Sequence, residues 1–529
     1  MNRVVARRVV AHRVVAAACF AAACCVGATA ARADGTLVIG IAADPTGLDP
    51  EAVLNNTSGF IMATIYDSLV KYKPGTVEPA PGLAQSWTIS PDGLTYQFKL
   101  HPGVKFQDGT PLDADSYIQG INRLLDKSSP IYIYNTGNVE GYIDFTYGDV
   151  ASLGKTDDHT VEFKMKKPSA PFLTSLAMVW NGVVSPTAAA KYGKDFRNHP
   201  VGSGPFIFKE WKSRDSITLD ANPTYWNGKP HLDHLIFKEY PDPQAALLAL
   251  KRGDIQILGD VSTTVLPALK GDKSIKLLTQ PGLAISGMGF PTDTPPFDNV
   301  TVRRALEYAI DRDAIDKALF KGFAVPMVSP LPASEWSFQP QQPTYNYDPA
   351  KAKKLLAEAG LKTPLSVEFL TYNSPRGYNP AGPDLAVAIQ GYLKKVGIDA
   401  ELRKLDMGAY LALVRGGKYH GLFMRGWTGD NGDPDNFVCE LWSSRNPVDN
   451  TTHFRNADVD RLCVEGLSET DHAKRVAIYQ QVQKLIWQGA PDLFVNSVEQ
   501  VRAIRTDVHG FQLNPTQMYF DMEKVSLSK

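Results

Sequence analysis

The sequence has few of the residues, and none of the motifs, that enzymes commonly use to hold a metal or to activate a nucleophile. It contains five cysteines and ten histidines in 529 residues, and no two cysteines form a Cys-x-x-Cys pair. Gly-x-Ser-x-Gly, Walker, Gly-x-Gly-x-x-Gly and His-Glu-x-x-His motifs are all missing. These absences argue against a hydrolase of the α/β type, a nucleotide-binding enzyme and a zinc site, so neither a cofactor nor a metal is expected.

Two short segments come nearest to catalytic chemistry. Ser203 lies between two glycines, but residues 205–208 continue as a strand instead of turning into a helix, as a nucleophile elbow would require. His231 and His234 precede a predicted strand in a loop, where histidines are usually solvated. We expect neither a nucleophile at Ser203 nor a metal at the histidines, and a secreted hydrolase is kept only as an alternative.

The first 33 residues have the layout of a secretory signal peptide. Four arginines between positions 3 and 13 precede an apolar run from Val14 to Ala31, which ends in Ala31-Arg32-Ala33 before Asp34. A membrane anchor is the alternative, but the run is rich in alanine, and a span needs about 20 strongly apolar residues. The three cysteines of this segment lack a lipobox led by leucine, which disfavours lipidation. We predict cleavage of residues 1–33 and a periplasmic location.

The chain that remains after cleavage is mildly acidic. The leader contains five arginines and no acid, so 50 Lys+Arg stand against 56 Asp+Glu, a net charge of −6. No basic tail or stripe is present, which argues against a nucleic-acid partner. No second long apolar run occurs, and a soluble mature protein is expected. Cys439 and Cys463, 24 residues apart, are the cysteines left; they could pair in an oxidising compartment or remain buried thiols.

Apolar periodicity predicts a mixed α/β protein. Residues 87–100 form a β-hairpin around Ser90-Pro91-Asp92-Gly93, and Asp113 caps a helix. A pair of helices is predicted over 302–319, single helices over 348–360, 384–396 and 471–487, and further strands near 161–165, 217–219 and 235–237. The proline-rich segment 326–349 is predicted to be an ordered surface loop. About 496 residues exceed what one core usually holds, so two or three lobes are expected.

Two segments carry a resemblance to a known family. Residues 376–380 read Arg-Gly-Tyr-Asn-Pro, and residues 426–437 read Gly-Trp-Thr-Gly-Asp-Asn-Gly-Asp-Pro-Asp-Asn-Phe. Both resemble the dipeptide-binding branch of the extracytoplasmic solute-binding proteins, family 5, of ABC importers. Shorter matches at residues 81–96, 201–206 and 302–306 extend the resemblance over nearly all of residues 35–525.

The resemblance implies an α/β fold, the periplasmic-binding-protein clamshell of class II (cluster C), with two lobes and an extra subdomain. Lobe 1 would comprise residues 34–70, 200–284 and 500–529, the subdomain 71–199, and lobe 2 residues 285–499. It also implies a monomeric, non-enzymatic receptor that takes up short peptides, dipeptides above all, and delivers them to an ABC permease in the inner membrane.

The resemblance implies a site as well. Asp430 would bind the ligand's amino group and Arg376 its carboxylate, with Tyr378 beside Arg376, Gly426 and Trp427 near the ligand, and Thr57 contributing from the other lobe. Arg425 replaces an apolar residue of the relatives and could tune the pocket.

The chemistry agrees with these roles. A dipeptide is a zwitterion, a planar guanidinium can make two parallel bonds to its carboxylate, and an aspartate is a pure acceptor for its ammonium. Receptors of the same fold for oligopeptides, haem, glutathione or a metal chelate remain as alternatives.

Overall fold

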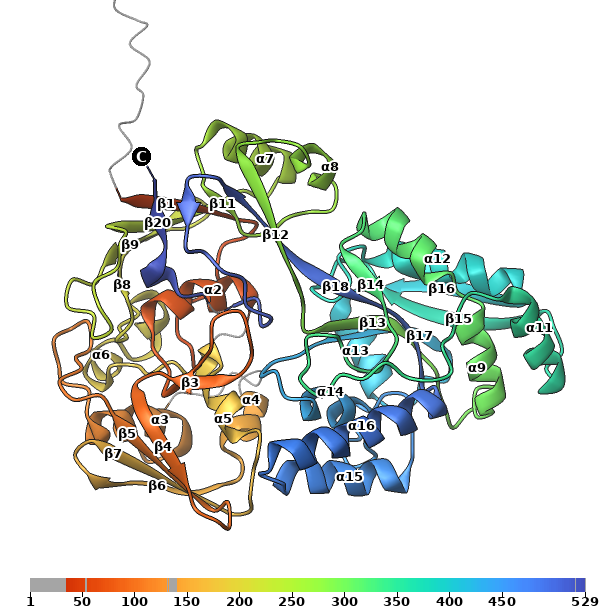
Figure 1. The fold of residues 1–529 in the computed structure, drawn as a ribbon, viewed down its shortest axis with the longest axis horizontal. Helices are drawn as coiled ribbons and strands as arrows, with labels where there is room; N and C mark the ends of the chain where they lie inside the picture. Colours follow the sequence, from red (N-terminus) through yellow and green to blue (C-terminus); the bar gives the residue numbers. More distant parts are fainter. Residues whose placement is uncertain (1–34, 53–54, 131, 133–139, 519, 529) are drawn as a thin grey trace, which may run out of the picture.

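The computed structural model describes residues 35–52, 55–130, 132, 140–518 and 520–528 (Figure 1). The predicted signal peptide lies outside these residues. Two bodies stand side by side in Figure 1: one is built mainly from the first half of the chain together with its C-terminal end, and the other from the second half. Among the described residues, no helix is long and apolar enough to cross a membrane.

One large sheet runs through both bodies. Its strand order is β16-β15-β17-β13-β18-β11-β1-β10-β9-β8, and β12 and β14 also pair with β18. Lobe 1 contains the strands β1 (Thr36–Ile41), β8 (Phe206–Lys212), β9 (Ser216–Ala221), β10 (His234–Glu239), β11 (Ile257–Leu258) and β12 (Ile275–Pro281). Lobe 2 contains β13 (Ala284–Gly289), β14 (Ala324–Pro326), β15 (Leu365–Tyr372), β16 (Ile398–Leu405) and β17 (Leu422–Thr428).

Strand β18 (Asp492–Arg505) connects the lobes. Its first half pairs with β13 and β14 of lobe 2, and residues 499–505 pair with β12 of lobe 1. The short segment between β12 and β13 makes a second crossing nearby. Because both crossings are extended chain at one place, we expect any movement of the lobes to take place about β18, which we call the hinge strand. The boundaries at 284 and 499 expected from the sequence lie at these crossings, and the division into domains stays a proposal.

A separate antiparallel sheet forms the subdomain. Its order is β4-β5-β7-β6, with β4 at Ala84–Ile89, β5 at Thr95–Leu100, β7 at Thr160–Met165 and β6 at Val150–Asp157. The predicted hairpin is confirmed: the Gly93 backbone N–H donates to the Ser90 carbonyl (2.8 Å), and Gly93 has a φ of 70°. The predicted cap is confirmed too, because Asp113 and Ser116 form a capping box on α3 (Ala114–Leu125).

The helices of lobe 1 and its surroundings are α2 (Asn56–Ile65), α6 (Pro186–Tyr192), α7 (Pro243–Arg252) and α8 (Leu266–Leu269), and the subdomain adds α4 (Glu140–Tyr147) and α5 (Phe172–Leu176). Lobe 2 contains α9 (Val300–Tyr308), α10 (Arg312–Ile315), α11 (Pro349–Glu358), α12 (Pro383–Lys395), α13 (Met407–Arg415), α14 (Asp435–Trp442), α15 (Ala457–Ser468) and α16 (His472–Gly489). The subdomain and lobe 2 share one continuous set of buried apolar side chains, while lobe 1 has its own core.

The proline-rich segment 326–349 is ordered, as predicted. Residues 339–349 are mostly exposed, but residues 326–338 are mostly buried, so the prediction of a surface loop is wrong for this first part. Leu331 and Ser337 are fully buried, and Gln483 of α16 donates a side-chain hydrogen bond to the Ser337 carbonyl (2.8 Å). Trp487 of the same helix donates to the Pro343 carbonyl (2.9 Å). The segment therefore packs against α16, which satisfies backbone carbonyls that a buried irregular segment would otherwise leave unpaired.

This buried segment contains a carboxyl group that makes stability depend on pH. Glu335 is 3% exposed, and neither carboxyl oxygen has a hydrogen-bond partner among the described residues. Burial, and next the charge of Asp433, raise the pKa of Glu335 well above its ordinary value of 4.5. Above pH 4.5 the folded protein therefore keeps a proton that the unfolded chain releases. The contribution of Glu335 to stability is fully present below pH 4.5 and is lost as the pH rises toward its raised pKa.

Glu335→Gln is expected to remove this part of the pH dependence. Relative to the wild type, the variant should gain stability as the pH rises from 5 to 8, by up to about 1.4 kcal/mol per pH unit. Urea unfolding of both proteins at several pH values measures the difference. The exposed Glu358→Gln serves as the control, and parallel curves for the wild type and Glu335→Gln would contradict the assignment.

Candidate functional site

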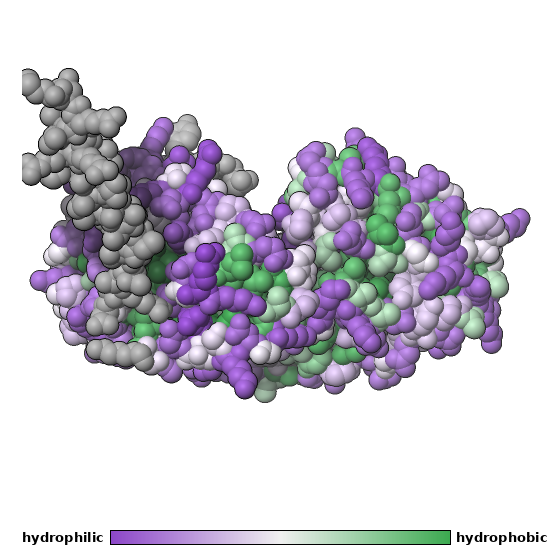
Figure 2. All heavy atoms as spheres, turned by 90° about the horizontal axis from the view of Figure 1, so that it is seen from above, coloured by the Kyte–Doolittle hydropathy of each residue, from purple (hydrophilic) through white to green (hydrophobic). Residues whose placement is uncertain are grey.

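A cavity of about 570 Å³ lies between the lobes, beside the hinge strand. Figure 2 shows the surface hollowed between the two halves of the molecule. Lobe 1 lines the cavity with residues that include Ala42, Asp260 and Ser262, and lobe 2 with Phe323 and residues 375–377. Residues 498–502 of β18 also line it. The volume is within the range of small-molecule sites, about 300–1,000 Å³.

Arg376 stands on the wall of this cavity, in a turn that follows β15. The backbones of Arg376 and Asn379 bond to each other in both directions (2.9 Å each). The buried amide of Asn379 donates to the Tyr372 hydroxyl (3.0 Å) and to the Gly382 carbonyl (2.8 Å). Arg376 itself is exposed and lines the cavity. Asn379 therefore positions the turn, a role that the sequence analysis did not assign although the residue lies in the first motif.

Tyr378 brings the two sequence motifs into contact. A Cβ atom on Gly426 would lie 2.2 Å from Cδ2 of Tyr378, so only glycine at 426 lets the ring lie against β17. A Cβ atom on Gly377 would lie 3.7 Å from Oγ1 of Thr428, also on β17. Burial raises the pKa of Tyr378, and the nearby charge of Arg376 opposes that rise. The tyrosine is therefore neutral beside the guanidinium.

Asn436 links Trp427 to Asp430. Its Oδ1 accepts from the Trp427 indole Nε1 (3.2 Å) and from the Asp430 backbone N–H (2.9 Å), and its Nδ2 donates to Asp430 Oδ2 (3.2 Å). Asn436 is 3% exposed, so a buried side chain holds Trp427 and Asp430 in these positions. Asn436 is the second positioning residue that the sequence analysis missed, although the second motif contains it.

The loop that contains Asp430 reaches the first half of the chain. The Tyr72 hydroxyl donates to the Asn431 carbonyl (3.3 Å), and the Asn431 amide donates to Ser175 Oγ (3.1 Å). Burial, and next the charge of Asp430, hold the pKa of Tyr72 well above its ordinary value. Burial and Asp449 raise the pKa of Glu440 to about 7, and Asp430 adds to the rise. These carboxyl groups make the surroundings of Asp430 acidic, which suits a cationic group of a ligand.

The structure places the six predicted site residues in two groups and leaves Thr57 apart from both. Arg376, Tyr378 and Gly426 form one cluster, and Asp430 and Trp427 are joined through Asn436. Of these, Arg376 lines the described cavity, whereas Asp430 and Trp427 do not. Thr57 lies in the first turn of α2 in lobe 1, is half-buried, and does not line the cavity either. The ligand-binding roles stay predictions.

Arg425 has a different role from the pocket-tuning one considered above. It is 9% exposed and donates through Nη1 to Asp492 Oδ2 (2.9 Å). Its Nη2 donates to the carbonyls of Leu441 (2.9 Å) and Asp449 (2.7 Å). The guanidinium is therefore buried inside lobe 2, where its hydrogen bonds hold β17 against β18 and α14.

Ser203 and His234 also have structural partners. Ser203 Oγ donates to Asp67 Oδ2 (2.9 Å), a buried carboxylate that also accepts from the Tyr225 hydroxyl (2.8 Å) and the Trp226 indole (2.9 Å). His234 shares a hydrogen bond with Asp220 (2.7 Å). Within the described part of the chain, no group of three His, Cys, Asp or Glu residues could hold a metal ion.

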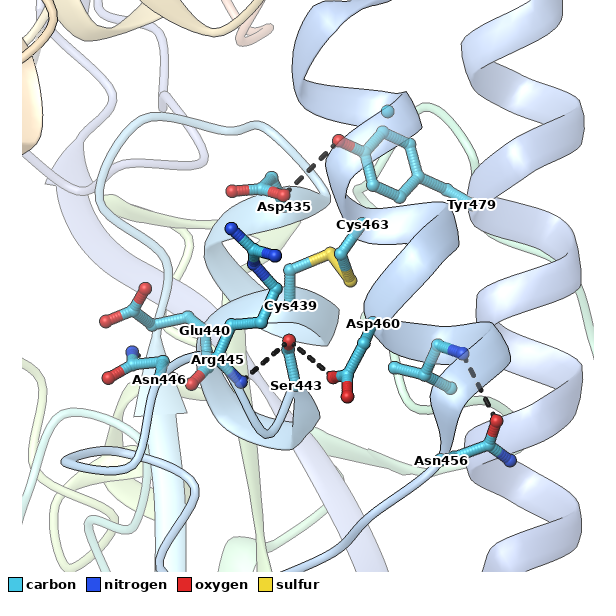
Figure 3. The surroundings of a disulfide bond; sticks show 12 residues. Asp435, Cys439, Glu440, Ser443, Arg445, Asn446, Asn456, Asp460, Cys463 and Tyr479 are labelled. Atoms are coloured by element: carbon cyan, nitrogen blue, oxygen red, sulfur yellow. Dashed lines mark hydrogen bonds between the residues drawn. A yellow bond between two sulfur atoms is a disulfide. The ribbon is translucent and has the colours of Figure 1, made fainter.

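A disulfide braces the helix that follows the second motif. Cys439 of α14 and Cys463 of α15 are bonded, with their Cα atoms 5.6 Å apart (Figure 3). Next to it, Ser443 Oγ donates to Asp460 Oδ1 (2.8 Å), so polar contacts hold the same two helices together. Since α14 begins at Asp435, directly after the loop of Asp430, this bracing limits the movement of that loop.

Comparisons with known proteins agree with this architecture. Residues 78–449 match the family described as bacterial extracellular solute-binding proteins, family 5 (Middle). The chain is 33% identical over 495 residues to the dipeptide-binding protein of Escherichia coli K12, covering 91% of this chain and 92% of that protein. It is 34% identical over 474 residues to haem-binding protein A of Haemophilus influenzae, covering 87% and 86%.

A solved structure gives the same result. The ABC transporter-associated periplasmic binding protein DppA of Helicobacter pylori, in complex with the peptide STSA, superimposes with a TM-score of 0.77 at 30% identity. The superposition covers 94% of this chain and 98% of that protein. Both the two-lobed fold and the sequence over most of its length therefore lead to one conclusion. The chain belongs to the bacterial extracellular solute-binding proteins, family 5.

Proposed function

We propose that this protein is the periplasmic receptor of an ABC importer for short peptides, dipeptides above all, which it binds by their free termini. The observation that carries the proposal is the contact between the two motifs: Tyr378 packs on Gly426, which places the exposed Arg376 and the strand that leads to Asp430 on one lobe. Relatives named for dipeptide binding support the ligand class. The protein would bind and release its cargo unchanged and pass it to the membrane permease.

The two charges match a zwitterion in sign and in chemistry. Arg376 offers a planar set of N–H donors at the cavity wall, and Asp430 offers acceptor oxygens oriented by Asn436. Closure of the lobes would exclude water and strengthen both contacts. A micromolar dissociation constant corresponds to about −8 kcal/mol, which two desolvated charge-assisted contacts and backbone bonds can supply.

We further propose that residues 1–33 direct export and are removed, and that the receptor acts as a monomer made of lobe 1, the subdomain and lobe 2 with the boundaries given above. The leader arrangement supports export, and the two crossings at the hinge strand support the division into lobes.

Glutathione is the second candidate ligand. A relative 30% identical over 495 residues is named glutathione-binding protein. Glutathione is a tripeptide with one amino group and two carboxylates, so it could use the same terminal contacts as a dipeptide. The cavity of about 570 Å³ has room for a ligand of this size.

Thermal unfolding with a panel of ligands tests the proposal. Ligand binding stabilises the folded state by RT ln(1 + [L]/Kd), which is about 2.7 kcal/mol at 100 times Kd. Dipeptides are expected to raise the melting temperature, and N-acetylated dipeptides, which lack the ammonium, to leave it unchanged. Glutathione and haem complete the panel. Equal shifts with acetylated and free dipeptides, or a shift with haem alone, would contradict the proposal.

A further inference from the structure

Arg502 is a buried cation on the floor of the interlobe cavity. It lies on the hinge strand β18, where it is paired with Leu278 of β12, and it lines the same cavity as Arg376. Its side chain is 9% exposed. Arg502 thus lies between the two lobes, on the strand that crosses from one to the other.

The guanidinium of Arg502 lacks the partners that a buried cation normally has. It makes one hydrogen bond, from Nη1 to the Val501 carbonyl (3.1 Å), and its Nε has no partner among the described residues. No described carboxylate lies within ion-pair distance of it. Asp260, whose charge acts on Arg502 from farther away, accepts a hydrogen bond from the Ala42 backbone N–H (3.2 Å).

The other buried arginines show how unusual this arrangement is. Four of them form ion pairs with buried carboxylates: Arg123, Arg312, Arg425 and Arg475. A fifth, Arg303, lacks such a pair but donates to the carbonyls of Phe297, Asp298, Gly489 and Ala490. A buried charge without a partner is costly, and the other five buried arginines of the described chain avoid that cost.

Gln500 adds a second unsatisfied group to the same floor. Alternation along a strand places Gln500 and Arg502 on one face of β18, and both line the cavity. The Gln500 amide donates to the Pro515 carbonyl (2.5 Å), which fixes the side chain, while its buried Oε1 has no partner among the described residues. The floor therefore presents a donor-rich cation beside an acceptor oxygen.

We propose that Arg502 binds a carboxylate of the peptide ligand, and that this receptor selects peptides with a carboxylate that reaches the hinge. The inference rests on the proposed function and refines it. Arg376 is available for one carboxylate of the ligand. Arg502 therefore suits ligands that have a second carboxylate, such as a peptide with an acidic side chain or glutathione. If Arg502 instead binds the C-terminal carboxylate, the contact between guanidinium and carboxylate is the same. The ligands used below distinguish a side-chain carboxylate from the C-terminal one.

Calorimetric titration of Ala-Ala, Ala-Glu and their C-terminal amides into the wild type and Arg502→Gln tests the proposal. The variant is expected to bind Ala-Glu about 10-fold more weakly or worse. A loss that persists with the Ala-Glu amide assigns the side-chain carboxylate, and a loss that disappears on amidation assigns the C-terminus. The proposal is overturned if Arg502→Gln binds every ligand like the wild type, or weakens Ala-Ala amide, which has no carboxylate, as much as Ala-Glu.

Two controls separate binding from folding. Arg505→Gln removes an arginine of the same strand that pairs with Asp507 (3.4 Å) and does not line the cavity, so it should bind all ligands normally. The melting temperature of unliganded Arg502→Gln should be unchanged or higher, since the variant removes an unpaired buried charge; a lower one would indicate a structural role and count against the proposal. If the wild type binds none of the peptides, the proposed function itself fails, whereas binding by both proteins alike defeats only the role of Arg502.

Discussion

Asp430→Ala is expected to weaken peptide binding by about 2–5 kcal/mol, which is the usual cost of truncating one partner of a desolvated charge pair. In the structure, Asn436 donates to the Asp430 carboxylate, and Glu440 and Asp449 add further carboxyl groups near this end of the proposed site. Without Asp430, a ligand ammonium would lose its counter-charge on closure of the lobes. Isothermal titration with a dipeptide that binds the wild type measures the change.

The conservative variant Asp430→Asn sharpens this test. It keeps the size of the side chain and its bond to Asn436 but removes the charge, so it should lose nearly as much affinity as the alanine variant. Asp458→Ala, which removes an exposed aspartate of α15, should bind like the wild type. If Asp430→Ala also binds like the wild type, the amino terminus of the ligand is recognised elsewhere.

The second large effect is expected on stability, from the ion pair between Asp433 and Arg475. The two oxygens of Asp433 accept from Nη1 (2.8 Å) and Nη2 (2.9 Å) of Arg475, and the side chains are 1% and 8% exposed. Arg475 also donates to the Gly466 carbonyl (2.9 Å). This bidentate pair ties the loop after β17 to α16.

Asp433→Ala is expected to lower the free energy of unfolding by about 3–5 kcal/mol, because it leaves the buried Arg475 without its counter-charge. Urea unfolding followed by tryptophan fluorescence measures the loss. Removing an exposed pair on α15 by Arg461→Ala should change the midpoint far less, since solvent screens it. A comparable effect of the two substitutions would show that burial does not govern the strength of the Asp433 pair.

Local patterns in the sequence were sufficient for several elements, but they did not predict the strands of lobe 2. The turn at residues 90–93, the cap at Asp113 and the start of α11 after Asp348 depend on contacts between residues close in the chain, and all three are confirmed. The family resemblance supplied the two-lobed architecture and the motifs of the site. The proline-rich segment was partly misjudged because its partners, Gln483 and Trp487, lie about 140 residues away, and no local pattern reveals them.

The residue types at the site were determined by the sequence alone: an arginine and a tyrosine in one motif, and a tryptophan and an aspartate in the other. Only the tertiary structure decided that Tyr378 packs on Gly426, that Asn436 orients Asp430, and that Arg425 turns into the interior of lobe 2. It alone placed Arg502 on the cavity floor, with no described carboxylate in ion-pair distance and no described partner for its Nε. The physical reason is that periodicity, caps and motifs are properties of neighbours in the chain, whereas burial and pairing of charges depend on segments that meet only after folding.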